Sequence, residues 1–312
     1  MNKSDKIYVA GHRGLVGRAI LKSLQRKGYK NIITRTHNEL DLTRQIDVET
    51  FFEEQQPDYV FLAAAKVGGI GGNSTYPADF IYINMAIALN VIHSAYKVGV
   101  KKLLNLGSTC IYPKMAPQPL KEDALLTGPL EVTNEAYALA KISAIRLCKH
   151  YNDQYGTNYI SAMPTNLYGP GDSYDLETAH VLPTMIRKFH EAKTNGGKVL
   201  LWGDGSPLRE FLYSEDLADA VIYLMENKDY SDIGEFINVG SGKELSIKKL
   251  AETIARIVGF EGEVEWDSSK PNGTPRKLSD ISRLVGLGWK PKVELETGIA
   301  ISYDDFQKRF CL

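Results

Sequence analysis

Tyr137 and Lys141 are the residues of this sequence whose types and spacing point most directly to chemistry. They stand four positions apart, so on a helix their side chains would share one face. A neighbouring ammonium favours the phenolate form of a tyrosine, and a tyrosine biased in this way can relay protons near neutral pH. An amphipathic helix with one buried and one solvated side would produce the same spacing without any chemistry. The pair therefore suggests a redox enzyme only if other segments supply the groups that such an enzyme needs.

A glycine-rich segment upstream is the first of these segments. It has the spacing GxxGxxG and consists of Gly11, His12, Arg13, Gly14, Leu15, Val16 and Gly17. It follows an apolar run and opens a helical pattern, the context in which such glycines form a tight turn that places a pyrophosphate at a helix N-terminus. A glycine turn without a ligand is the alternative. The order of strand, turn and helix favours a dinucleotide-binding turn.

The end of the second predicted strand bears on the choice between NAD(H) and NADP(H). A site for NAD usually carries an acidic residue there, which binds the ribose 2′-hydroxyl. This sequence has TRTHN over residues 34–38 instead. Arg13 and Arg35 could hold a 2′-phosphate between them, although either could be an ordinary surface charge. We therefore predict NADP(H), with Asp41 and Leu42 beside the adenine, or with Asp41 as the cap of the next helix.

Ser108 stands at the end of the fourth predicted strand. Ligands of open α/β sheets bind at the carboxyl ends of the strands. A hydroxyl at that place could donate a hydrogen bond to a substrate carbonyl while Tyr137 delivers or removes the proton. Lys141 could in addition hold the ribose of a nicotinamide. Ser108 alone could be a turn residue, but with the pair on the helix it completes a group suited to hydride-transfer chemistry.

Alternating apolar strands and amphipathic helices must carry these residues. Strands are predicted at residues 6–11, 31–35, 59–65, 102–108 and 159–164, with helices at 15–27, 45–55, 79–98 and 134–155. Such alternation is typical of a doubly wound parallel sheet of the Rossmann type. After residue 164 the pattern loosens, with shorter strands predicted at 199–202, 235–239 and 264–266. We predict an α/β fold with a dinucleotide-binding domain over residues 1–170, to which some later segments return, and a smaller α/β substrate-binding lobe over 171–312.

The composition excludes several other classes of protein. The 312 residues are 43% hydrophobic and 24% charged, a balance typical of a globular protein with room for two connected cores. Thirty-seven basic and 38 acidic residues leave a formal charge of −1, so no global field favours nucleic acid or an anionic membrane. We expect neither a signal segment nor an apolar run long enough to span a bilayer. The three cysteines form no CxxC pair and the six histidines show no metal-ligand spacing, so we predict a cytoplasmic protein without a metal.

The glycine turn, the strand-end serine and the Tyr-x-x-x-Lys motif together resemble the extended short-chain dehydrogenase/reductase family, which acts largely on nucleotide sugars. Four longer segments are similar to the GDP-L-fucose synthase branch of that family: AAAKVGGI at 63–70, STCIYP at 108–113, MPTNLYGP at 163–170 and WGDGSPLREFL at 202–212. The similarity extends from residue 6 to residue 303, and these segments are far more specific than the glycine turn alone.

The resemblance implies a two-part reaction. Enzymes of that branch take GDP-4-keto-6-deoxy-D-mannose, invert C3 and C5, and reduce the C4 ketone with NADPH to give GDP-L-fucose. The ketone acidifies both neighbouring carbons, so inversion needs a base on one face of the sugar and an acid on the other. Cys110 is the candidate base and His180 the candidate acid, because a thiol and an imidazole titrate near enough to neutral pH. Cys110 could otherwise be a small buried hydrophobe, and His180 a residue that starts a helix.

The same resemblance implies the ligand contacts. For the cofactor these are, besides the glycine turn, Arg35, Asp41 and Leu42, the residues His37, Leu106, Gly107, Lys141, Pro164, Asn166, Leu167 and His180. For the GDP-sugar they are Lys188, Trp202, Arg209, Lys270 and Asn272, in a region where the loop from residue 270 to 277 offers further cations. The guanidinium of Arg209 suits a diphosphate and the indole of Trp202 offers a flat surface. The family often has arginine at positions 37 and 188, so Lys188 loses the bidentate fork and His37 weakens the argument for a 2′-phosphate.

Two further alternatives stay open at this point. The chain could be another nucleotide-sugar 4-epimerase or a simple 4-reductase, which would use the same serine, tyrosine and lysine but exchange no protons at C3 and C5. It could also be a regulatory protein that binds NADP without turnover. The resemblance implies a homodimer through the helices at 79–98 and 134–155, although ordinary core packing would explain the same apolar faces.

Overall fold

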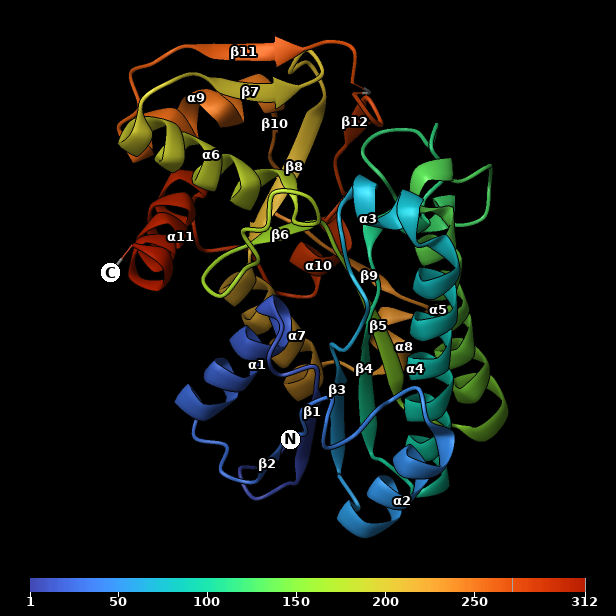
Figure 1. Cartoon of the computed structure of the whole chain (residues 1–312). Helices are drawn as coiled ribbons and strands as arrows, with labels where there is room; N and C mark the ends of the chain where they lie inside the picture. Colours follow the sequence, from blue (N-terminus) through green and yellow to red (C-terminus); the bar gives the residue numbers. More distant parts are fainter. Residues whose placement is uncertain (271, 312) are drawn as a thin grey trace.

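A six-stranded parallel sheet forms the centre of the protein (Figure 1), in a computed structural model that describes residues 1–270 and 272–311. Its order is β2-β1-β3-β4-β5-β9, and each neighbouring pair is parallel. The strands are β1 Ile7–Ala10, β2 Ile32–Ile33, β3 Tyr59–Leu62, β4 Lys102–Leu106, β5 Tyr159–Pro164 and β9 Ile237–Val239. The order reverses between β1 and β3, as it does in doubly wound folds. The predicted Rossmann-type fold class is therefore confirmed.

Both faces of this sheet are apolar and buried. In β1, Ile7 and Val9 belong to the core on one face, while Tyr8 and Ala10 belong to the core on the other. All four are at most 1% exposed. Strands buried on both faces have continuous apolar sequences, which is why the sequence shows no alternation here. Such a sheet is stable only when helices cover it on both sides.

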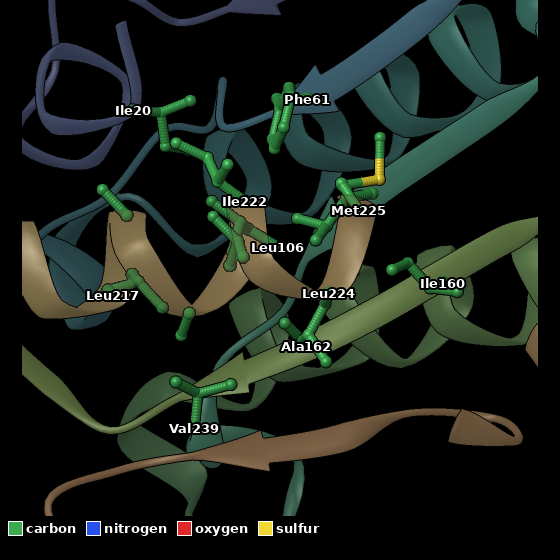
Figure 2. Packing of buried hydrophobic residues seen from close by; sticks show 14 of the residues in the cluster. Ile20, Phe61, Leu106, Ile160, Ala162, Leu217, Ile222, Leu224, Met225 and Val239 are labelled. Carbon is green, nitrogen blue, oxygen red and sulfur yellow. The ribbon is translucent and has the colours of Figure 1, made fainter. Parts of the chain in front are cut away.

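Five helices provide this cover. They are α1 Leu15–Arg26 and α7 Ser214–Asn227 on one face, and α2 Gln45–Gln55, α4 Pro77–Lys97 and α5 Glu135–Tyr155 on the other. Figure 2 shows how Leu217 and Leu224 of α7 pack in one core with Leu106 and Ile160 of the strands. The sheet is thus packed on both faces, and the loops at its carboxyl edge extend from this packed core.

A smaller α/β unit follows in the second half of the chain. Its central strand is β8 Leu208–Tyr213, which pairs with β6 Asn166–Tyr168, β10 Glu244–Ser246 and β12 Arg276–Lys277, while β7 Val199–Trp202 pairs with β11 Val264–Asp267. An apolar core of its own lies between these strands and the helices α6 Val181–Asn195, α9 Ile247–Val258 and α11 Leu295–Phe310. Short helices complete the chain: α3 Ile70–Thr75, α8 Tyr230–Ile233 and α10 Ser282–Gly286. The exact domain boundary at residue 170 stays a prediction.

Several strands differ from the sequence prediction, and β1, β3 and β4 are each shorter than expected. β2 is shorter than the expected 31–35, because the chain turns after it and Glu39 N–H donates to Thr36 O. The strand expected at 235–239 is β9, and it pairs with β5 in the main sheet instead of joining the smaller unit. β9 and α7 are therefore the later segments of the chain that return to the first domain.

α4 contradicts one expectation from the sequence. Within residues 1–270 and 272–311 it is the one helix whose length and apolar composition would allow it to cross a membrane, where we expected no such run. Its residues Val91, Ile92 and Ala95 are fully buried in the core beneath the sheet. A helix that packs on a sheet and also on α5 needs this apolar composition for its two packed faces.

The glycine turn depends on a close approach between Gly17 and Gly11. Gly11 has a φ of +83°, and a Cβ placed on Gly17 would lie 2.1 Å from Gly11 O. A Cβ on Gly14, whose φ is −74°, would lie 3.5 Å from the same oxygen, an ordinary contact. The turn therefore tolerates a methyl group at one glycine and not at the other.

We predict that Gly17→Ala lowers the free energy of unfolding by about 3 kcal/mol, because the turn or the start of α1 must shift. Gly14→Ala is the matched control and should change it by less than about 1 kcal/mol. Urea unfolding followed by circular dichroism measures both. Equal stabilities of the two variants would show that the close approach is not a constraint.

Candidate active site

A cavity of about 610 Å³ lies at the carboxyl ends of β1, β3, β4 and β5, where the sheet order reverses. Its lining brings together most of the predicted residues: Gly11, Gly14, Leu15, Val16, Gly17, Arg35, His37, Asp41, Leu42, Leu106, Gly107, Ser108, Tyr137, Lys141, Pro164, Asn166, Leu167 and His180. The other predicted residues are not among the described residues that line it: His12, Arg13, Cys110, Lys188, Trp202, Arg209, Lys270 and Asn272.

The N-terminus of α1 opens onto this cavity. Gly14 is its N-cap and provides no side chain to the free N–H groups of the first turn. Gly14 N–H itself donates to Gly11 O at 3.0 Å, which closes the turn. The remaining N–H groups and the helix dipole favour an anion at this end. The turn thus has the geometry that a phosphate site requires.

The far end of the cavity is formed by the segment after β2. Arg35 lines the cavity and donates from Nη1 to Thr34 O at 2.9 Å. Asp41 Oδ1 accepts from the N–H and the hydroxyl of Thr43, so this carboxylate holds a turn before α2 and lines the cavity as well. Arg13 is exposed and is not part of the lining. Of the two predicted arginines, Arg35 is therefore the one that could face a 2′-phosphate.

Lys141, Tyr137 and Ser108 converge as the sequence predicted. Tyr137 and Lys141 lie one turn apart on α5, and Lys141 Nζ is 5.6 Å from the centroid of the Tyr137 ring. Lys141 Nζ donates to Leu106 O at 2.8 Å, at the end of β4. Ser108 follows two residues later and lines the same cavity. A hydroxyl, a phenol and an ammonium thus surround one volume.

Burial controls the ionisation of Tyr137 and Lys141. It raises the pKa of Tyr137 above that of an ordinary tyrosine, with a smaller contribution from Cys110. It lowers the pKa of Lys141 to about 8. Burial therefore acts against the bias towards phenolate that the sequence predicted for Tyr137. A neutral phenol can donate a proton, and this is the form that burial favours.

Cys110 lies directly behind this group. It is 6% exposed, and its N–H donates to Ser108 Oγ at 3.4 Å. Burial raises the pKa of its thiol, while the Ser108 hydroxyl, Lys277 and Lys141 act in the opposite direction. The thiol form therefore predominates, and a base at this position would need cations or a ligand to become a thiolate.

His180 is the N-cap of α6 and faces the cavity from the opposite unit. Its ring is exposed to the open cavity, yet the surrounding walls remove enough water to lower its pKa below that of an ordinary histidine. The segment before it is held by Gly69 N–H, which donates to Thr178 O at 2.9 Å. Burial thus favours the neutral imidazole, and the backbone that leads to His180 is tied to the loop after β3.

The predicted substrate residues lie on the smaller unit. Lys188 of α6 donates from Nζ to Leu200 O, and Lys270 Nζ lies 5.5 Å from the Trp202 ring. Asn272 Oδ1 accepts from Asp204 N–H at 3.0 Å and so fixes the turn after β7. Arg209 is half-buried on β8, where burial lowers its pKa. These groups could form a second, cationic and aromatic part of the site.

Comparison with known proteins decides the family. The model of the NAD dependent epimerase/dehydratase family matches residues 7–240. The chain is 59% identical to "GDP-L-fucose synthase 1" of Arabidopsis thaliana, covering 99% of this chain and 95% of that protein, and 50% identical to "GDP-L-fucose synthase" of Escherichia coli K12, covering 98% of each. The solved structure of MlghC, a GDP-mannoheptose C4 reductase from Campylobacter jejuni with NADP bound, superposes with a TM-score of 0.91 at 41% identity, covering 98% and 99% of the two chains. The chain belongs to the NAD dependent epimerase/dehydratase family.

The cavity fits the dinucleotide that the family name implies. The close approach of Gly17 to Gly11 leaves room for backbone alone, and the open first turn of α1 can bind phosphate. No acidic residue ends β2, and Arg35 lines the cavity at that point. The residues of this epimerase/dehydratase family member therefore suit a dinucleotide with a 2′-phosphate.

Lys277 is the functional candidate that the sequence did not single out within the 270–277 loop. It pairs with Arg209 in the parallel register of β12 and β8, so both side chains leave the sheet on the same side. Burial lowers the pKa of Lys277, and the interaction with Cys110 opposes this shift. Lys277 thus lies near both the Cys110 thiol and Arg209. Only the strand register reveals this, and no sequence motif encodes it.

Proposed function

We propose that this chain converts GDP-4-keto-6-deoxy-D-mannose into GDP-L-fucose by inversion at C3 and C5 and NADPH-dependent reduction at C4. The observation that carries the proposal is the single cavity in which Ser108, Tyr137, Lys141 and His180 meet the glycine turn. The names of the plant and bacterial relatives support the GDP-sugar substrate. The NADP in the related C4 reductase supports the choice of cofactor.

Reduction at C4 would use the three groups around Lys141. The bound dinucleotide supplies a hydride. Tyr137 Oη, neutral because of its raised pKa, donates a proton to the C4 oxygen. Ser108 Oγ–H donates a hydrogen bond to the same oxygen and stabilises the charge that develops on it. Lys141 Nζ, held by Leu106 O, is placed to bind a ribose hydroxyl and to restore the proton to Tyr137.

Inversion at C3 and C5 would use Cys110 and His180 on opposite sides of the sugar. The C4 ketone acidifies both carbons, so one base removes each proton and one acid returns it on the other face. For Cys110 the cations of Lys277 and Lys141 favour the thiolate that a base requires. Lys188, Trp202, Arg209, Lys270 and Asn272 would hold the GDP moiety on the smaller unit.

A simple C4 reductase is the second candidate. It is favoured by the burial of Cys110 and by its absence from the described lining of the cavity. MlghC, with the same fold and 41% identity, is named as such a reductase. The two candidates differ in one observable, which is exchange of the protons at C3 and C5.

Assembly and location belong to the same proposal. Exposed apolar residues lie along α4 and α5, with Tyr82 68%, Leu89 54% and Leu139 38% exposed, and they support a homodimer through these two helices. A solution molar mass of one chain would contradict it. The three free cysteines support a reducing, cytoplasmic location.

The function is tested by supplying the purified protein with GDP-4-keto-6-deoxy-D-mannose and NADPH in deuterated water. We expect GDP-L-fucose with deuterium at C3 and C5, identified by NMR and mass spectrometry. A C4-reduced sugar without deuterium at either carbon would establish the simple reductase instead. No consumption of NADPH would contradict both enzymes.

Tyr137→Phe tests the proton donor. The variant removes only the hydroxyl, so kcat for reduction should fall by about 10²- to 10⁴-fold. Binding of NADPH, followed by fluorescence, should stay within about twofold because the ring and Lys141 remain. Tyr155→Phe, an exposed tyrosine on the same helix, is the control and should keep full activity. An unchanged kcat in Tyr137→Phe would exclude this role.

Cys110→Ser tests the base for inversion. A serine hydroxyl is a far weaker acid than a thiol, so deuterium incorporation at C3 and C5 should fall by at least about 10²-fold. Reduction of the unepimerised ketone should persist, because Ser108, Tyr137 and Lys141 are unchanged. Cys148→Ala, at a buried thiol in the core beneath the sheet, is the control. Normal exchange in Cys110→Ser would remove Cys110 from the mechanism.

A further inference from the structure

Asp172 is a buried carboxyl group that the proposed mechanism does not use. It lies in the loop between β6 and α6 and lines the large cavity together with the glycine turn. The residue is 8% exposed. Its Oδ1 accepts from Ser173 N–H at 2.8 Å, whereas its Oδ2 is buried without a partner among the described residues. A carboxyl oxygen of this kind needs a hydrogen-bond partner, and a ligand in the cavity could supply it.

The loop places Gly171, the residue before Asp172, against the side chain of Arg18 at the start of α1. A Cβ on the preceding Gly171 would lie 3.0 Å from Nη1 of Arg18, and Arg18 N–H donates to Gly14 O in the phosphate turn. Gly171 N–H donates to Asp305 Oδ2, and Arg309 donates to Asp172 O. The loop is thus fixed between α1 and α11 and has little freedom to move Asp172 away.

The charged and titratable groups around Asp172 come from α1, from α11 and from the loop itself. Arg18 lies on α1, Asp305 and Arg309 on α11, and the phenol of Tyr174 on the loop itself. Burial raises the pKa of Asp172 to about 7, and the hydrogen bond from Ser173 and the charge of Arg309 oppose the rise only in part. At neutral pH the neutral acid and the carboxylate are therefore both populated.

We propose that Asp172 in its neutral form donates a hydrogen bond from Oδ2 to an anionic phosphate oxygen of the dinucleotide, so that binding of the cofactor is coupled to uptake of a proton. The inference rests on the cofactor assigned in the proposed function. A carboxylate at this wall would repel an anion at the N-terminus of α1, whereas a carboxylic acid donates to it. The affinity for the dinucleotide is then fully present below pH 7 and is lost as the pH rises, because the ionised form of Asp172 must be protonated first.

Isothermal titration calorimetry of NADPH in two buffers with different ionisation enthalpies measures the proton uptake directly. For wild type we expect uptake by Asp172 of about half a proton at pH 7, rising towards one at pH 8.5. Lys141 and His180 also line the cavity, and the 2′-phosphate of NADPH titrates near pH 6. The difference between wild type and Asp172→Asn therefore isolates the contribution of Asp172.

Asp172→Asn keeps a donor but has no proton to lose. For wild type we expect the dissociation constant of NADPH to rise by an additional factor of about ten between pH 8 and pH 9. The dissociation constant of Asp172→Asn should not show this additional rise. Asp172→Ala, without a donor, should bind about tenfold more weakly than Asp172→Asn at pH 6. Asp304→Asn, at an exposed position of α11, is the control and should behave as wild type.

Three outcomes would decide against the inference or its basis. Equal proton uptake in wild type and Asp172→Asn would show that Asp172 does not change protonation on binding. Release of a proton in wild type relative to Asp172→Asn would mean that the carboxylate accepts from a ribose hydroxyl, which also overturns the inference. If wild type binds no NADPH at any pH, the proposed function itself fails.

Discussion

The hydrogen bond from Lys141 Nζ to Leu106 O fixes the geometry on which the rest of the site depends. Lys141 is 7% exposed, so its ammonium has exchanged water for a carbonyl partner at the end of β4. The desolvation of a buried cation is offset only when such a partner stays in place. The hydrogen bond therefore links α5 to the carboxyl end of β4. In this position Tyr137, one turn before Lys141, and Ser108, two residues beyond Leu106, line the same cavity.

Glu210 connects the two parts of the chain through hydrogen bonds in a similar way. Its side chain is fully buried, and its two carboxylate oxygens accept from Gly242 N–H and Ser279 N–H. Its carbonyl accepts from the side chains of Thr165 and Asn166, both of which line the cavity. A buried carboxylate that lost these donors would be strongly destabilising. β8 and the segment after β12 are thus held to the end of β5, and Lys277 of β12 comes close to Cys110.

The sequence predicts those parts of the site that local chemistry determines. The GxxGxxG turn and the spacing of Tyr137 and Lys141 need only a strand, a turn and a helix in order, and Gly11, Ser108 and Lys141 meet as expected. Lys277 could not be found in this way, because its position depends on the register of β12 beside β8. Nor could the rise in the pKa of Tyr137 be foreseen, since the neighbouring lysine is visible in the sequence but the loss of water around the phenol is not. Asp172 was missed because its burial in the wall of the cavity cannot be seen in the sequence either.

Burial shifts four titratable groups of the cavity towards their neutral forms. The pKa values of Tyr137 and Asp172 are raised, and those of Lys141 and His180 are lowered, with burial as the largest cause in each case. A negatively charged ligand in such a cavity favours bound protons, so it raises the pKa values of Lys141 and His180. The imidazolium that an acid for inversion requires is therefore favoured when phosphates enter the site. The charge of a bound ligand would therefore act against burial at Lys141 and His180, and with burial at Tyr137 and Asp172.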